Sequence, residues 1–275
     1  MSPLLRNELR VVLCPDKVIL LGLGKGLHRK VIVQKVLPCT SLPGVPSWQP
    51  AMDTLEAWLD SNEISRANVK VILSNHFVRY ALIPFSPDVT SRAEEQALAL
   101  ILMENTYGDP AKIWRLEIAV GGYGEPRLVA AVDEELLVAI ENIIKSTTLQ
   151  LVSIRPYLIS AFNSFRNQMQ GADGLFALAE SGQLVLATFK NEQLFSVRRL
   201  TLNGQLNEQL PSHLMREIIM VGQEAGDVPV YLHVTERPDL SLPSYSGLLI
   251  QTLRHSDSEE TWSKDDVRFD MACSG

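Results

Sequence analysis

The stretch LRVVLCPDKVILLGLGKGLHRKVIVQKVL, residues 9–37, contains three apolar runs that are separated by short turns. The runs are rich in Val, Ile and Leu, and Gly, Pro and Asp lie between them, which is the pattern of successive β-strands. After a proline-rich connector, residues 51–62 place apolar side chains at i, i+3 and i+7, the spacing of one helical face. The apolar run VKVILSN (69–75) follows. This part of the chain is therefore predicted to have the order βββαβ.

Residues 174–236 repeat this order of elements. Three apolar runs form a second meander, residues 210–226 carry Leu214 and Ile218 on one helical face, and VPVYLHV (228–234) closes the unit as a strand. The residues of the two copies differ, so what repeats is the order of elements. Because a duplicated βββαβ unit is the skeleton of the actin-like, ribonuclease H-like fold, we predict an α/β protein of this class.

A third region with its own pattern lies between the two copies. Ser91 and Glu94 form a capping box at the start of a helix that Gly108 and Pro110 end. Two strands and another helix follow, which indicates a small α/β subdomain inserted between the halves. The predicted segments are a first actin-like half (1–76), the inserted α/β subdomain (77–150), a second actin-like half (151–253) and an acidic C-terminal tail (254–275).

Composition excludes several classes of function. The 25 Lys and Arg residues against 32 Asp and Glu residues give a net charge of −7 without a basic stripe, so we predict no nucleic-acid partner. The three cysteines are far apart and form no CxxC pair, which argues against a disulfide framework and a zinc site. The longest clean apolar run has seven residues, far fewer than a membrane span needs. We expect a cytoplasmic protein that does not cross a membrane.

Residues 70–240 contain a strand that ends in Ile83-Pro84, a helix rich in Ala and Leu with Glu104, a strand with Trp114 near its start, a V-A-x-V-D strand (129–133), and a strand that ends at Pro156. In these features they resemble the cytoplasmic actin-like domain of the type II secretion protein GspL, and are similar to the pilus platform proteins PilM and MshI. These features are an order of elements with loosely specified positions.

The resemblance implies a scaffold that binds partners and carries no catalytic residues. Its partners would be a bitopic inner-membrane PilN-like protein and the assembly ATPase, and it would lie at the inner membrane through them. Extended peptides commonly add a strand to a sheet edge, and prolines after FVRYALIPF (77–85) suggest an edge strand. Arg79, Ile83 and Phe85 are therefore the predicted partner-binding residues. The sequence leaves open a homodimer and a polymerising actin-like protein.

In actin-like ATPases, the turn of the first hairpin in each half holds phosphate and Mg²⁺ through a carboxylate, glycine and Ser or Thr. Here the first turn offers Asp16 and Lys17 after Pro15, with no glycine, and the second offers Glu180, Ser181 and Gly182. An adenosine-binding turn would fall within 235–247, which is proline-bearing. We predict a degenerate nucleotide site and no cofactor. The alternative is a functional actin-like ATPase or small-molecule kinase, with ATP and Mg²⁺ bound at these residues.

The glycine-rich GLGKG (22–26) imitates a phosphate-binding loop. Such loops open a helix, whereas the residues that follow GLGKG alternate as a strand does, so a hairpin tip is predicted. The basic residues at this tip could form a contact surface. His76 and Cys14 lie near strand ends, but no neighbouring residues complete a catalytic set, and no metal site is predicted. The tail is expected to be mobile, or else to form a short strand or docking peptide around Phe269.

Overall fold

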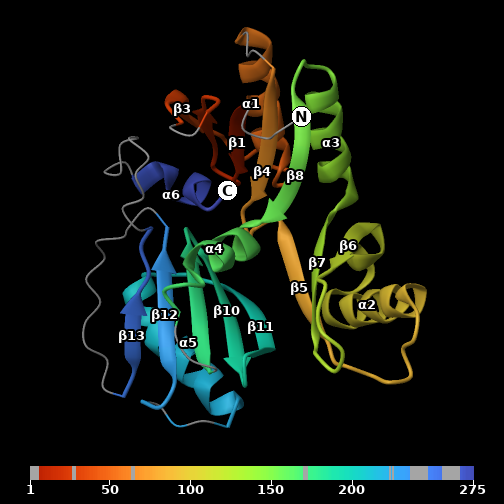
Figure 1. Ribbon diagram of the computed structural model, residues 1–275, viewed down its shortest axis with the longest axis vertical. Coiled ribbons are helices and arrows are strands. Elements are labelled where there is room, and N and C mark those ends of the chain that lie inside the picture. The colour runs from red at the N-terminus through yellow and green to blue at the C-terminus, as the bar shows by residue number, and fades with distance from the viewer. Residues whose placement is uncertain are drawn as a thin grey trace. The chain divides into compact units, whose positions relative to one another are not determined.

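A computed structural model of the protein divides into two compact units (Figure 1). It describes residues 6–26, 29–62, 66–169, 173–222, 224, 226–235, 247–255 and 267–275. The first unit contains residues 1–78, 133–164 and 255–275, and the second contains residues 79–132 and 165–254. These boundaries differ from the predicted segments, because the inserted strands and the second half fall into the same unit.

The first unit contains a five-stranded sheet in the order β3-β2-β1-β4-β8. Its strands are β1 (Asn7–Leu13), β2 (Lys17–Leu23), β3 (Val31–Pro38), β4 (Ala67–Leu73) and β8 (Gln150–Pro156). The first three strands pair antiparallel, whereas β4 pairs parallel with both β1 and β8. The residues of β1 and β2 are almost all buried, as expected for central strands that are covered on both faces.

Helices α1 (Gln49–Ser61) and α3 (Glu134–Lys145) pack against strands of this sheet and against each other. Helix α4 (Tyr157–Phe165) follows β8 directly, and the side chain of Asn75 accepts a hydrogen bond from the Leu158 N–H at 3.2 Å. That bond satisfies one of the N–H groups that the first turn of a helix leaves without a helical partner. The buried amide of Asn75 therefore has a structural role.

The second unit contains a sheet with the same topology, in the order β11-β10-β9-β12-β13. Its strands are β9 (Gly174–Glu180), β10 (Gln183–Lys190), β11 (Gln193–Thr201), β12 (Pro229–Val234) and β13 (Leu249–Thr252). Three antiparallel strands again precede two parallel ones. The duplicated βββαβ order is confirmed, and β13, which the sequence pattern missed, corresponds in position to β8.

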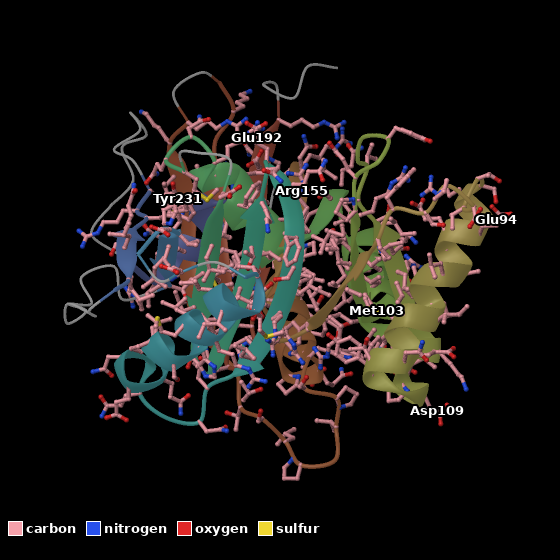
Figure 2. The ribbon with its side chains drawn as sticks, turned by 90° about the horizontal axis from the view of Figure 1, so that it is seen from below. Glu94, Met103, Asp109, Arg155, Glu192 and Tyr231 are labelled. Carbon is pink, nitrogen blue, oxygen red and sulfur yellow. The ribbon has the colours of Figure 1, made fainter. Side chains whose placement is uncertain are left out.

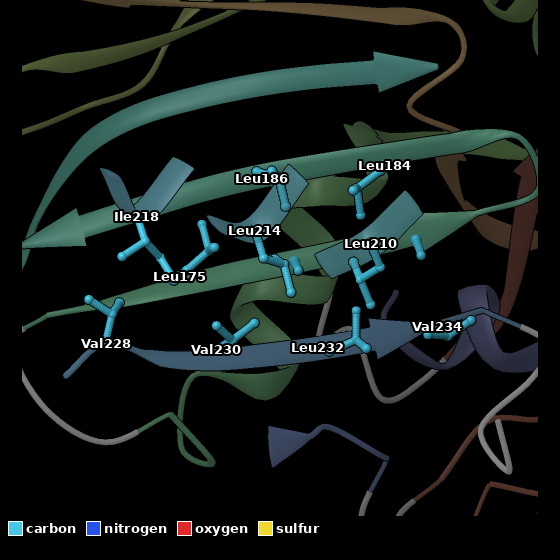
Figure 3. Close-up of a cluster of buried hydrophobic side chains, with 12 residues drawn as sticks. Leu175, Leu184, Leu186, Leu210, Leu214, Ile218, Val228, Val230, Leu232 and Val234 are labelled. Atoms are coloured by element: carbon cyan, nitrogen blue, oxygen red, sulfur yellow. The ribbon is translucent and has the colours of Figure 1, made fainter. Parts of the chain in front are cut away.

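Helix α5 (Leu206–Met220) covers one face of this second sheet. It buries Leu210, Leu214 and Ile218 against leucines and valines of β9, β10 and β12 (Figure 3). The helix begins four residues earlier than predicted and contains Pro211. Because proline is disfavoured in the interior of a helix, the helix was predicted to begin beside Pro211 rather than before it.

A three-stranded sheet in the order β5-β7-β6 forms the inserted region, from β5 (Val78–Ile83), β6 (Trp114–Ile118) and β7 (Arg127–Asp133). Helix α2 (Arg92–Tyr107) packs on it, and a short 3-10 turn, η2 (Asp109–Ile113), leads to β6. The predicted capping box is confirmed, since the Ser91 side chain accepts from the Glu94 N–H and the Glu94 carboxylate accepts from the Ser91 N–H. Figure 2 shows Glu94 and Asp109 at opposite ends of α2.

The C-terminal residues form a short 3-10 turn, η3 (Val267–Phe269), and the helix α6 (Asp270–Cys273). They pack against β1 and β2, with Phe269, Met271 and Ala272 buried. The prediction of a mobile tail or a strand is therefore wrong for this part, because its apolar residues have a sheet to pack on. Residues 256–266 of the predicted tail lie outside the described residues. Among the helices that are described, none is both long and apolar enough for a membrane crossing.

Candidate functional site

The turn between β1 and β2 has features that do not suit phosphate binding. The Cys14 N–H donates to the Lys17 carbonyl at 3.0 Å, which closes a tight turn around Pro15 and Asp16. Pro15 has no N–H, and the Asp16 carbonyl accepts from the Cys39 N–H at 2.7 Å. The Asp16 carboxylate is 61 % exposed and lies 3.5 Å from the Lys17 ammonium. This turn offers a carboxylate for a cation but a poor set of backbone donors for a phosphate.

The turn between β9 and β10 is better suited to an anion. Glu180 is buried at the end of β9, whereas Ser181 and Gly182 are exposed. Gly182 has φ +73°, a conformation that L side chains rarely adopt, and its carbonyl accepts from the Leu202 N–H at 2.9 Å. This turn lies in the second unit, whereas Asp16 and Lys17 lie in the first. Of the predicted adenosine-binding turn, residues 236–246 lie outside the described residues.

We expect Mg-ATP at millimolar concentration to leave the melting temperature of the protein unchanged. A ligand that binds only the folded state increases the free energy of unfolding by RT ln(1 + [L]/Kd), so significant binding would raise the melting temperature. Differential scanning fluorimetry with and without Mg-ATP measures this. A rise of several degrees that Asp16→Ala or Glu180→Ala abolishes, and the exposed control Asp109→Ala keeps, would show a working nucleotide site.

The prediction that the glycine-rich GLGKG lies at a hairpin is confirmed, since Gly22 and Leu23 end β2, which pairs antiparallel with β3. A Cβ on Gly22 would come within 2.8 Å of the Val33 Cβ, so this glycine permits the close approach of the neighbouring strand. The Gly24 N–H donates to the Lys30 carbonyl at 2.8 Å, and the Lys25 N–H donates to the Asn7 side chain at 3.1 Å. These glycines and amides build the hairpin. His28, a predicted part of its basic tip, lies outside the described residues.

In the part of the chain that the structure describes, strand β5 lies at an edge of the three-stranded sheet, next to β7. The edge position that its flanking prolines predicted is confirmed. The guanidinium of Arg79 lies 5.9 Å from the centroid of the Trp114 ring, within cation–π range. Burial, and the charge of Arg199, lower the pKa of Arg79. An edge strand with a half-buried arginine can bind an extended peptide through its backbone and through a charged side chain.

Ile83 does not contribute an accessible side chain to this edge. It is only 4 % exposed and packs in the core that α2 forms with the sheet, beside Ala99 and Met103. The prediction that Ile83 binds a partner therefore stays a prediction for its backbone alone, because its side chain is buried. A strand that packs on a helix turns every second side chain inward, and the sequence did not reveal which set faces the core.

Phe85 is 42 % exposed and lies at the end of β5 beside the turn between β6 and β7. Its ring meets the ring of Tyr123 edge to face, with centroids 5.0 Å apart, and Tyr123 is 91 % exposed. Val120 on the same turn is fully exposed. We call Phe85, Val120 and Tyr123 the aromatic turn surface. Exposed aromatic side chains are typical anchors of protein interfaces.

The sequence pattern missed Tyr123 and Val120, although a signal was present. Tyr123 stands between Gly122 and Gly124 in a turn that continues to Glu125. The Gly122 N–H donates to the Glu125 carboxylate at 2.7 Å, and Gly124 has φ +86°. A large aromatic residue in a glycine-rich turn is exposed because the turn has no core to pack on. That placement could have indicated a contact residue.

Two further side chains near strand ends, Cys14 and His76, make contacts within the fold. Cys14 is buried, and its thiol lies 3.7 Å from the sulfur of Met271, so it packs as a small apolar group. The ring of His76 lies 2.9 Å from the hydroxyl of Ser74. Ser74 is fully buried, and its hydroxyl also accepts from the His76 N–H at 3.3 Å, so this serine–histidine contact belongs to the local turn after β4.

Comparisons with known proteins place this fold among solved structures. No protein-family model matches the sequence, and no curated protein does. A PilM–PilN type IV pilus biogenesis complex has a chain that matches 97 % of this chain and 96 % of its own, with a TM-score of 0.65 and 16 % identity.

Two other structures are similar. The cytoplasmic domain of EpsL, an inner-membrane component of the type II secretion system of Vibrio cholerae, covers 98 % of this chain and 95 % of its own, with a TM-score of 0.55 and 14 % identity. A Bacteroides thetaiotaomicron protein with an actin-like ATPase fold and unknown function covers 84 % of this chain and 82 % of its own, with a TM-score of 0.57 and 10 % identity. The chain therefore has the actin-like fold, and the predicted resemblance to PilM and to a type II secretion protein is confirmed at the level of the fold.

Proposed function

We propose that this protein is a cytoplasmic scaffold of an inner-membrane assembly platform, in a type IV pilus, an MSHA-like pilus or a type II secretion system. It would bind the cytoplasmic segment of a bitopic PilN-like protein and connect it to the assembly ATPase, without catalysing a reaction. The observation that carries this proposal is the edge strand β5 beside the aromatic turn surface. The fold likeness over nearly the whole chain to a PilM–PilN complex supports it.

The mode of binding that this arrangement favours is strand addition. An extended peptide would pair its backbone with the outer edge of β5, because extended segments commonly bind by adding a strand at the edge of a sheet. Apolar side chains of the peptide would pack on Phe85 and Tyr123, and a carboxylate or carbonyl could contact Arg79. A homodimer built through the same edge would compete with the partner for it.

Replacing both Phe85 and Tyr123 by serine is expected to weaken binding of the PilN-like segment about tenfold or more, because aromatic anchors dominate interface energies. Both side chains are substantially exposed, so the fold should be retained. Isothermal titration calorimetry with the cytoplasmic segment of a PilN-like protein from the same organism measures the affinity.

The matched control is Ile101→Ser, which removes a 54 % exposed side chain from α2 in the same unit. It should leave the affinity within about twofold. Equal losses in both variants, or unchanged affinity in the aromatic variant, would contradict binding at this surface.

The second candidate is an actin-like ATPase or small-molecule kinase. The turn at Glu180, Ser181 and Gly182 favours it, because a serine and a glycine of positive φ can turn backbone N–H groups toward an anion. The glycine-free turn at Asp16 and Lys17 argues against it. The melting experiment with Mg-ATP described above distinguishes the two candidates.

A further inference from the structure

One face of the first unit's sheet carries several cations beside the helix α6. Glu8 and Arg10 are two residues apart on β1 and therefore point to the same face. Arg10 is in register with Lys70 on β4, so Lys70 shares this face. Arg155 on β8 is in register with Ile72, two residues beyond Lys70, and it lies on this face as well. Three neighbouring strands thus contribute positive charge to one surface.

Glu8 lies at the centre of three cations, which are Arg10 and Lys70 of this face together with Arg29, which precedes β3. Its carboxylate is 2.7 Å from Arg10 Nε, 3.0 Å from Arg29 Nη1 and 3.1 Å from Lys70 Nζ. The Arg29 and Lys70 contacts share the same oxygen, Oε2. Arg10 also donates to the carbonyl of Ala272 at 3.0 Å, which ties it to α6. Arg10 therefore stabilises the packing of α6 on the sheet. Arg29 and Lys70 share a single oxygen atom of the Glu8 carboxylate.

The charges on this face do not balance. Within the described part of the chain, Glu8 is the one carboxylate within ion-pair distance of Arg10, Arg29 and Lys70, and no ion pair of Arg155 is found. The side chains of Arg29 and Lys70 are only 20 % and 29 % exposed, so water solvates them incompletely. Because the single Glu8 carboxylate neutralises these partly buried cations only in part, a further anion that reached them would be attracted.

We propose that this basic sheet face, formed by Arg29, Lys70 and Arg155 around Glu8, is a docking surface for an acidic peptide segment of a partner protein. The whole chain has a net charge of −7, so an acidic segment is repelled elsewhere and directed to this face. Acidic side chains at alternate positions of an extended segment point the same way, as the cations of this face do. The incomplete exposure of Arg29 and Lys70 favours a carboxylate on a flexible side chain over a flat membrane surface.

This surface lies in the first unit, whereas the β5 edge and the aromatic turn surface lie in the second. The inference therefore does not depend on the proposed function. Variants at Lys70 or Arg155 test the basic sheet face, and variants at Phe85 or Tyr123 test the β5 edge. Either site can fail without the other.

The test uses a fluorescein-labelled peptide of alternating glutamate and serine, with a peptide of alternating lysine and serine as its counterpart, and fluorescence anisotropy at low salt. The full-length protein should bind the acidic peptide and not the basic one. Arg155→Gln, an exposed change that leaves the Glu8 ion pairs intact, should weaken binding about threefold or more. Lys70→Gln combined with Arg155→Gln should weaken it about tenfold or more.

Lys145→Gln is the matched control, since Lys145 is 71 % exposed on α3 of the same unit and pairs with Glu141. It should change the affinity by less than about twofold if the effect is local. Equal losses in the control and the double variant, or wild-type binding no stronger than that of the basic peptide, would overturn the proposal. Vesicles of phosphatidylglycerol that compete fully with the peptide, and lose binding in the double variant, would overturn it in favour of a membrane surface.

Discussion

Replacing Glu8 by glutamine is expected to lower the free energy of unfolding of the first unit by about 3 kcal/mol. The change removes the carboxylate that Arg10, Arg29 and Lys70 share and leaves three cations close together on the sheet. Urea denaturation of the variant and the wild type measures the difference. The control is Glu141→Gln, which breaks an exposed pair with Lys145 on α3 and should cost less than about 0.5 kcal/mol.

The same carboxylate gives this stability a pH dependence. Burial by itself raises the pKa of Glu8, but hydrogen bonds and charge from Arg10 and Lys70 outweigh it, and the pKa falls from 4.5 to about 2. Because the folded state holds the charged form, the stabilisation is complete above pH 4.5 and is lost as the pH falls toward 2. The wild type should lose its advantage over Glu8→Gln across this window. A constant difference between the two proteins from pH 6 to pH 2 would show that Glu8 is not charged in the fold.

Replacing Leu214 by alanine is expected to lower the free energy of unfolding of the second unit by about 3 kcal/mol. Leu214 lies in the middle of α5, has no exposed surface, and packs against the leucines and valines of β9, β10 and β12 (Figure 3). The change removes three buried carbon atoms and leaves a cavity. Chemical denaturation followed by circular dichroism measures the loss.

Ile219→Ala is the comparison on the same helix. Ile219 is 67 % exposed, so its replacement should change stability by less than about 0.5 kcal/mol. If the two variants were equally stable, the apolar face of α5 would not be the one that packs on the sheet.

The duplicated architecture could be predicted because each half repeats strong local signals. Alternating or continuous apolar runs indicate strands, and the run around Leu214 has helical spacing. The strand β13 escaped prediction because it is a short edge strand with mostly exposed residues, so its sequence has little pattern. The C-terminal helix α6 escaped because its stability comes from the sheet it packs on, with Arg10 bonded to its carbonyls.

The features of the candidate sites could also be predicted only in part from the sequence. The edge position of β5 followed from its prolines, and the poverty of glycine at Asp16 could be seen directly in the sequence. The burial of Ile83 could not be foreseen, because a period of two indicates that alternate residues share a face but not which face meets α2. The basic sheet face depends on the register of β1, β4 and β8, which are far apart in sequence. No local pattern contains that information.

We propose that β5 binds an extended segment of a PilN-like protein. Amide hydrogen exchange with and without that segment tests it most directly. Exchange should slow in β5 (78–83) on binding and stay unchanged in β6 (114–118), the opposite edge of the same sheet. Binding that leaves exchange in β5 unchanged would contradict strand addition at this edge.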